Sequence, residues 1–233
     1  MTTIFRHTLF QIYHHRVRMY LFLIVFGCTL LSYTRGTVEG LNGITSWFVW
    51  VLGAGLIGKD IAAGTLHLWI TRPLVRYQYV LAKWLALSAA SAAAGGVHLA
   101  LGVIILGTCF HKAPPLPAVG MAAIIILTTA LSMSAMVAAF SCILRGMGDL
   151  ALWFGVWLAA SLSTWILELN KIHTELFSYF TQSLFAPGSQ LADSLQNGAW
   201  NTPHWAAFVF VTAGFLSLAS WLMNRKEFSY CNG

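Results

Sequence analysis

Six long runs of residues with almost no charge divide this chain. They cover residues 17–34, 40–58, 84–110, 118–144, 150–167 and 204–223. Each approaches or exceeds the roughly 20 apolar residues that a helix needs to cross a bilayer, and backbone inside lipid must be helical because no water satisfies it. Of the 233 residues only 9% are charged, whereas a soluble domain carries about 25%. The sequence therefore predicts an all-α integral membrane protein with six transmembrane helices, forming a single domain over residues 1–233.

Lysine and arginine are distributed unevenly among the segments that join these runs. If both termini lie in the cytoplasm, the inner segments hold ten of them: Arg6, Arg16, Arg18, Lys59, Arg72, Arg76, Lys83, Arg145, Arg225 and Lys226. The outer segments then hold three: Arg35, Lys112 and Lys171. Cytoplasmic loops are enriched in these residues, so both termini are predicted to be cytoplasmic. The basic residues are scattered over separate loops, which argues against a nucleic-acid partner.

The first 18 residues have a pattern of their own. Apolar Ile4, Phe5, Leu9 and Ile12 recur at helical spacing, with histidine and arginine between them. This pattern predicts an interfacial helix over residues 1–18 that lies along the inner leaflet, and it does not fit a cleavable signal.

A second amphipathic pattern lies between the fifth and sixth runs, in residues 168–203. Its apolar residues recur at helical spacing up to the break at Pro187 and Gly188. We expect short helices at the outer surface here. A plain amphipathic loop explains the pattern equally well.

The stretch from Gly53 to Gly58, GAGLIG, matches the GxGxxG pattern of dinucleotide sites. That motif requires a strand before it and a helix after it, whereas here it stands at the inner end of an apolar run. We interpret it as a place where helices pack closely. The sequence contains no GxxxxGK[ST] phosphate loop, so the chain is predicted to have no ATPase site and no catalytic residue of its own.

His98 is the one ionisable residue in the middle of a predicted span. Ion-coupled carriers usually need a buried carboxylate, and membrane cytochromes often use paired histidines on facing helices. We interpret His98 as a hydrogen-bonded interior residue, with a place in a translocation path beside Trp153 and Trp157 as the functional alternative. Those tryptophans are also compatible with simple helix packing. The four cysteines form no CxxC pair, and no metal site is predicted.

The segment from Gly58 to Lys83 is the only charge-dense stretch between two long apolar runs. It comprises GKDIAAGTLHLWITRPLVRYQYVLAK. A short helix is predicted to begin near Asp60 and to end before Pro73, because the residue before a proline disfavours helix. An ordinary positively charged inner loop would also explain the composition.

At these residues the chain resembles the membrane subunits of ABC exporters of the second type, the ABC-2 permease family. The family signature is an acidic residue, GTL four positions later, an apolar patch, RP with a following arginine, and a lysine that opens the next span. The matching residues are Asp60, Gly64, Thr65, Leu66, Leu68, Ile70, Arg72, Pro73, Arg76 and Lys83. Many relatives carry glutamate where this chain has Asp60. The six-span layout and the basic tail are similar as well.

The resemblance implies a permease subunit in the cytoplasmic (inner) membrane of a bacterium, with a coupling helix in residues 59–83 that docks on a separate ATPase. The residues that would contact the ATPase are Asp60, Ile61, Gly64, Thr65, Leu66, Leu68 and Ile70. Those that would anchor the segment at the lipid headgroups are Arg72, Pro73, Arg76 and Lys83. Asp60 would pair with a basic residue of the ATPase, and Asp60→Ala would then impair coupling without affecting membrane insertion.

The same resemblance implies the partners and the cofactors. Two ATPase subunits would hold ATP and magnesium, a second permease subunit (identical or different) would complete the complex, and this chain would hold no cofactor. The alternatives are a haem-exporter-type subunit of cytochrome c maturation and a membrane anchor subunit of a redox enzyme.

Overall fold

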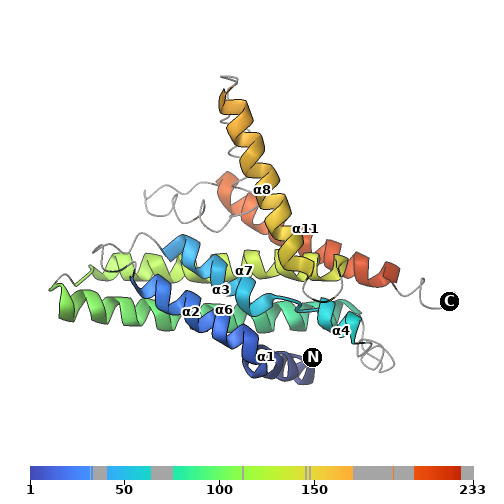
Figure 1. Ribbon diagram of the computed structural model, residues 1–233, viewed down its shortest axis with the longest axis horizontal. Coiled ribbons are helices and arrows are strands. Elements are labelled where there is room, and N and C mark those ends of the chain that lie inside the picture. The colour runs from blue at the N-terminus through green and yellow to red at the C-terminus, as the bar shows by residue number, and fades with distance from the viewer. Residues whose placement is uncertain are drawn as a thin grey trace.

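The computed structural model describes residues 1–31, 33, 41–63, 76–111, 113–144, 146, 148–169, 191 and 202–226. Every regular element in these residues is a helix, which confirms the all-α prediction for this part of the chain. The helices are α1 (Thr2–His14), α2 (Arg16–Leu30), α3 (Leu41–Gly53), α4 (Gly58–Ala62), α6 (Arg76–Cys109), α7 (Leu116–Ile143), α8 (Gly148–Leu169) and α11 (Thr202–Lys226) (Figure 1).

Four helical stretches are long and apolar enough to cross a membrane: Ile44–Ala62, Arg76–Cys109, Leu116–Ile143 and Thr202–Arg225. They correspond to the second, third, fourth and sixth predicted spans. In place of the first predicted span, α2 has 15 residues, about 22 Å of helix. In place of the fifth, the chain has a shorter apolar stretch, Gly148–Ser163. Six spans therefore stay a prediction at these two positions.

Three helix boundaries differ from those predicted. The interfacial helix ends at His14, because His15 is extended (φ −84°, ψ 100°) and caps the start of α2. The second span is interrupted after Gly53 by a turn in which Gly55 has a φ of +69°, a conformation that glycine adopts without strain. Helix α6 begins at Arg76, before the predicted start of the third span at Trp84, since no proline or glycine lies between them.

Helix α7 is at the centre of the packing. Helices α3, α6 and α11 all pack against it, while α1 lies along the first part of α6. The interior of α7 is rich in alanine and serine, including fully buried Ala135, Ala138 and Ala139. Small side chains let helix backbones approach each other closely. In Figure 1, α6 and α7 run side by side as two long helices, and α8 leaves the bundle at a steep angle.

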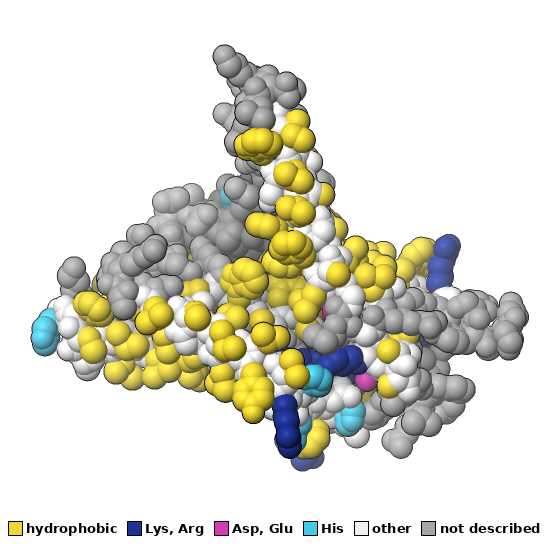
Figure 2. Space-filling view, in the orientation of Figure 1, with side chains coloured by type: hydrophobic (Ala, Val, Ile, Leu, Met, Phe, Trp, Pro, Cys, Tyr) yellow, Lys and Arg dark blue, Asp and Glu magenta, His cyan; other side chains and the backbone are white. Residues whose placement is uncertain are grey.

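The surface separates apolar from charged residues. On the face shown in Figure 2, hydrophobic side chains cover most of the bundle and α8, while lysine, arginine and histidine gather mainly over the region of α1. The largest exposed apolar side chains include Leu23 and Ile24 of α2 and Phe210 of α11. An apolar exterior of this extent is typical of a surface that faces lipid.

Candidate functional site

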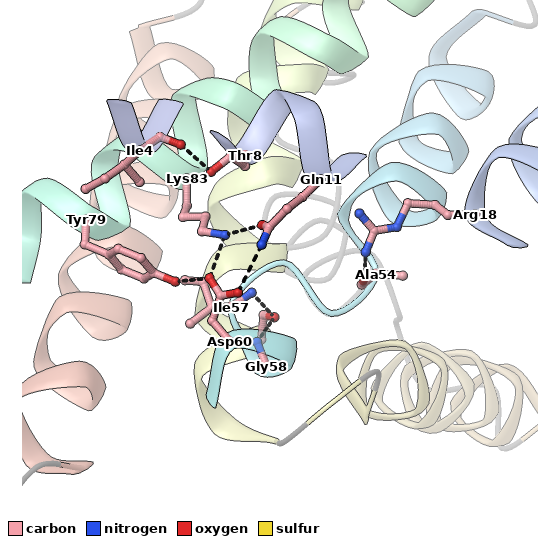
Figure 3. Close-up of polar contacts among 11 residues, drawn as sticks. Ile4, Thr8, Gln11, Arg18, Ala54, Ile57, Gly58, Asp60, Tyr79 and Lys83 are labelled. Carbon is pink, nitrogen blue, oxygen red and sulfur yellow. Dashed lines mark hydrogen bonds and ion pairs between the residues drawn. The ribbon is translucent and has the colours of Figure 1, made fainter. Parts of the chain in front are cut away.

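A cluster of buried polar side chains surrounds Asp60 at the charged end of the bundle. Its carboxylate lies 2.8 Å from Lys83 Nζ and accepts hydrogen bonds from Tyr79 Oη (2.5 Å) and Gln11 Nε2 (3.3 Å). Lys83 Nζ also donates to Gln11 Oε1 at 2.9 Å. The four side chains converge from α4, α6 and α1 (Figure 3). Asp60 and Lys83 are 4% and 1% exposed, so the cluster is shielded from solvent.

The local sequence explains how this cluster forms. Tyr79 and Lys83 are four residues apart on α6 and therefore lie on the same face of the helix. Gln11 lies on α1 in the turn that also contains buried Ile12. The pair of hydrogen bonds that Gln11 makes to Asp60 and Lys83 uses both the oxygen and the nitrogen of its amide. A buried charge pair is stable only when its remaining hydrogen-bonding capacity is satisfied, and Tyr79 and Gln11 do this here.

The position of Asp60 differs from the one expected. Its partner was predicted to be a basic residue of an ATPase, but its partner in the structure is Lys83 of the same chain. Ile61 is also buried, at 7% exposed, in the main apolar core. Lys83 is fully enclosed by protein, at 1% exposed. The sequence pattern could not show this, because it does not reveal that α1 covers this end of α6.

Arg76, the other described residue of the predicted anchor, is the first residue of α6. Its Nη1 lies 3.4 Å from Oδ1 of Asn224 in α11. The remaining predicted site residues lie outside the described residues: Gly64, Thr65, Leu66, Leu68, Ile70, Arg72 and Pro73. The amphipathic pattern of residues 170–190 also lies outside them.

The glycine-rich turn between α3 and α4 packs directly on the end of α7. A Cβ atom on Gly53 would lie 2.7 Å from Leu87, and one on Gly58 would lie 2.6 Å from the carbonyl oxygen of Gly146. Gly146 N donates to the carbonyl of Gly58 at 2.8 Å. The interpretation of GAGLIG as a close-packing motif is therefore confirmed.

Ser141 of α7 stabilises this turn through two hydrogen bonds. Its Oγ accepts hydrogen bonds from the backbone N–H groups of Ile57 and Gly58, each at 2.9 Å. These are N–H groups at the start of α4, which have no partner within their own helix. The serine hydroxyl therefore has the role of a capping group supplied by a different helix.

We expect Ser141→Ala to reduce the free energy of unfolding by about 2–3 kcal/mol, because two buried N–H groups lose their acceptor. Ser132→Ala is the matched control. Ser132 lies on the same helix and is also buried, but its hydroxyl donates to a carbonyl within α7, Thr128 O at 3.0 Å. Its loss should cost less than about 1 kcal/mol. Thermal unfolding of both variants in detergent measures the difference, and equal losses would contradict this role of Ser141.

Arg18 and Asp149 form a second buried polar group beside the turn. Arg18 Nη2 donates to the carbonyl of Ala54. Asp149, at the first turn of α8, accepts from Gly55 N at 2.8 Å and from Leu150 N at 3.0 Å. The turn thus contacts α2, α7 and α8 through hydrogen bonds.

His98 makes a separate set of polar contacts, further along α6 than the Asp60 cluster. It is 0% exposed, and its ring nitrogens lie 3.0 Å from Thr29 Oγ1 and 3.1 Å from Tyr33 Oη. A neutral imidazole has one donor and one acceptor, and two hydroxyls can satisfy both. The interpretation of His98 as a hydrogen-bonded interior residue is confirmed.

The two tryptophans predicted for a translocation path lie in a separate aromatic group. Trp153 is half-buried and contacts Trp47, Trp50 and Trp157, with ring centroids 5.9, 4.7 and 6.4 Å away. Trp157 is 46% exposed. The rings recorded around His98 are Phe26, Tyr33 and Phe48. The described contacts therefore do not bring the three predicted residues into one site.

Sequence reasoning missed several residues that complete these clusters, among them Gln11, Tyr79, Ser141 and Asp149. Two signals were present. Tyr79 lies one helical turn before Lys83, and Asp149 directly precedes an apolar run, the position of a helix-start residue. Gln11 and Ser141 carried no such signal.

The chain matches no family model and no curated protein among those compared.

Proposed function

We propose that this chain is the membrane-spanning permease subunit of an ATP-binding cassette transporter, an exporter whose separate ATPase subunits hydrolyse ATP. Two lines of evidence support the proposal. The described helices include four of spanning length, and the segment between the first two has the acidic, GTL, RP and lysine pattern described above. In the proposed complex, ATP and magnesium are bound by two ATPase subunits, and a second permease subunit is present.

The single observation that carries this proposal is the ion pair between Asp60 and Lys83. These residues lie at the beginning and at the end of segment 59–83, so the pair joins the two ends of the proposed coupling segment. Through Gln11 the same cluster reaches α1. A displacement of the segment by an ATPase would therefore be transmitted to α4, α6 and α1 together. The segment between these ends, from Gly64 to Ile70, is our proposed docking element.

The proposed topology has six spans, with both termini on the cytoplasmic side of a bacterial inner membrane. It is supported by the distribution of lysine and arginine and by the charged cluster over α1 in Figure 2. In this arrangement, α1 lies along the inner leaflet and the Asp60 cluster lies at the cytoplasmic end of the bundle.

We expect a soluble subunit with a phosphate-binding loop to co-purify with the chain from native membranes in mild detergent. Mass spectrometry identifies it, and ATP hydrolysis by the complex confirms it. Gly64→Trp places a bulky side chain in the proposed docking element and should reduce the recovered ATPase at least about tenfold, the effect of losing about 1.4 kcal/mol of binding.

Leu116→Trp is the control for this substitution. Leu116 is the first residue of α7 and is 83% exposed. It follows the end of α6 that is opposite to Arg76, so the same added bulk should leave the ATPase bound. A chain that purifies alone, or with a haem protein and without an ATPase, would contradict the proposal and favour the redox anchor subunit. Haem absorbance in the purified sample separates that case directly.

A further inference from the structure

A small basic pocket lies beside the Asp60 cluster, between α1, α2 and the turn that leads into α4. Its cavity volume is about 170 Å³. This is well below the roughly 300–1,000 Å³ of sites for drug-sized ligands, so a single chemical group fits better than a whole metabolite. The lining residues are Thr8, Gln11, Ile12, His15, Arg18, Gly55, Leu56 and Lys59.

Two buried nitrogen atoms of cationic side chains in this lining, Arg18 Nε and Lys59 Nζ, have no hydrogen-bond acceptor among the described residues. Arg18 is 4% exposed; one of its terminal nitrogens donates to Ala54, but its Nε is buried without a hydrogen-bond partner. Lys59 Nζ is buried and likewise has no partner in the described part of the chain. Buried donors are nearly always satisfied, and an unsatisfied one calls for an explanation. A bound anion would supply the missing acceptor for both.

The charges around the pocket favour an anion. Asp149 interacts electrostatically with both Arg18 and Lys59, but its oxygens accept hydrogen bonds from the backbone of Gly55 and Leu150. One carboxylate therefore faces two cations. Asp60, the other nearby acid, is already paired with Lys83. The pocket is left with one uncompensated positive charge.

The start of α2 adds to this charge. His15 is the N-cap of this 15-residue helix, and its ring accepts a hydrogen bond from Arg18 N at 3.4 Å. That contact uses Nδ1, so the neutral ring carries its proton on Nε2 as a further donor. The N-terminus of a helix also has a partial positive charge that favours anions.

We propose that this pocket binds a phosphate group, supplied either by an anionic phospholipid or by phosphate in solution. Arginine and lysine are the side chains that bind phosphate most strongly, through charge-assisted hydrogen bonds. Arg18, Lys59 and the His15 ring are the donors that the site offers. Occupancy of the pocket would stabilise the contact between α1, α2 and the α3–α4 turn.

The first measurement is the binding of two probes to the purified full-length chain and to its Lys59→Gln variant. Phosphatidylglycerol binding is followed by native mass spectrometry against phosphatidylcholine, and inorganic phosphate binding by the rise in Tm at constant ionic strength. Lys59→Gln should weaken binding at least about tenfold, because it removes one charged hydrogen bond. Arg16→Gln is the control: it removes the same charge from an exposed position at the start of α2 and should leave binding unchanged.

The two probes distinguish the source of the phosphate. A response to phosphatidylglycerol alone assigns the site to a lipid headgroup, and a response to inorganic phosphate alone assigns it to a soluble ligand. Two results would overturn the proposal. One is wild-type protein that binds phosphatidylglycerol no better than phosphatidylcholine and whose Tm does not rise with inorganic phosphate. The other is an equal loss of binding in the Lys59→Gln and Arg16→Gln variants. Because Lys59 Nζ has no hydrogen-bond partner among the described residues, Lys59→Gln should fold; its Tm without ligand checks this.

The pH dependence gives an independent test. Burial, followed by the charges of Lys59 and Arg18, lowers the pKa of His15 from its usual 6.5. Both charged groups facing the ring are cations, and Thr8 and Gln11 of α1 are neutral. A bound phosphodiester would favour the protonated ring strongly enough to offset the loss of the long contact from Arg18 N to Nδ1, so phosphatidylglycerol should bind more tightly as the pH falls below about 6.5. In His15→Gln this change should disappear, and its persistence would contradict the participation of His15.

Discussion

Asp60→Ala should reduce the free energy of unfolding by about 3–5 kcal/mol, the usual cost of leaving one member of a buried ion pair without its partner. Lys83 would keep its bond to Gln11 but lose the carboxylate 2.8 Å away. Tyr79 Oη would lose its acceptor as well. Thermal unfolding in detergent, followed by tryptophan fluorescence, measures the loss.

A double-mutant cycle separates the ion pair from other effects of the substitution. Lys83→Met removes the buried cation while keeping an unbranched side chain of similar length. If the pair is the cause, the double variant should be more stable than the sum of the single changes predicts, by at least about 1 kcal/mol. Strict additivity would show that Asp60 and Lys83 do not stabilise each other.

The internal pairing of Asp60 also changes how a coupling experiment is interpreted. From the sequence alone, Asp60→Ala was expected to impair coupling while leaving the protein intact. Because Asp60 is 4% exposed and paired internally, loss of activity in that variant would report loss of structure as well. Gly64→Trp, in the proposed docking element itself, is the cleaner test of coupling.

Gly58→Ala should be almost as damaging, at about 3–4 kcal/mol, since it combines overpacking with the loss of a buried backbone hydrogen bond. The added Cβ would lie 2.6 Å from Gly146 O and 2.8 Å from Leu144 O. Both are backbone atoms, so no side-chain rotation relieves the contact. Separation of the turn from the end of α7 would also break the 2.8 Å bond from Gly146 N to Gly58 O.

Gly96→Ala is the matched control for this substitution. Gly96 lies within α6, and a Cβ there would meet no atom within 4 Å. Alanine has a higher helix propensity than glycine, so this variant should be unchanged or more stable by up to about 1 kcal/mol. If Gly58→Ala unfolds at the same temperature as Gly96→Ala, the close contact with Gly146 is not a constraint on the protein.

The sequence predicted the helices better than it predicted the cluster between them. Long uncharged runs are a direct consequence of lipid as a solvent, so α6, α7 and α11 occur close to their predicted places. The third span was predicted to begin at Trp84, directly after the charge of Lys83. The helix begins earlier, at Arg76, and it can include Lys83 because a partner for the buried charge, Asp60, comes from another helix.

The contacts that define the cluster depend on tertiary structure. Ser141 is one of several serines on α7, and only the turn that packs on it distinguishes it from Ser132 or Ser134. Gln11 is an ordinary polar residue of an amphipathic helix until α1 lies against α6. The glycines of GAGLIG were interpreted correctly because three of them within six residues, at the end of an apolar run, indicate a close approach, whereas Gly96, within a helix, marks none.

The length of α6 determines the depth of the ion pair in a bilayer. Its 34 residues form a rod of about 51 Å, whereas a hydrocarbon core of about 30 Å takes up only about 32 Å of helix at a tilt of 20°. The polar residues Arg76, Gln78 and Lys83 direct the surplus of about 20 Å to the first end of the rod. Lys83 is about 10 Å from that end and would then lie at headgroup depth. Bilayer thickness therefore becomes a variable for this protein, because a thicker membrane would draw the pair toward hydrocarbon and increase its desolvation.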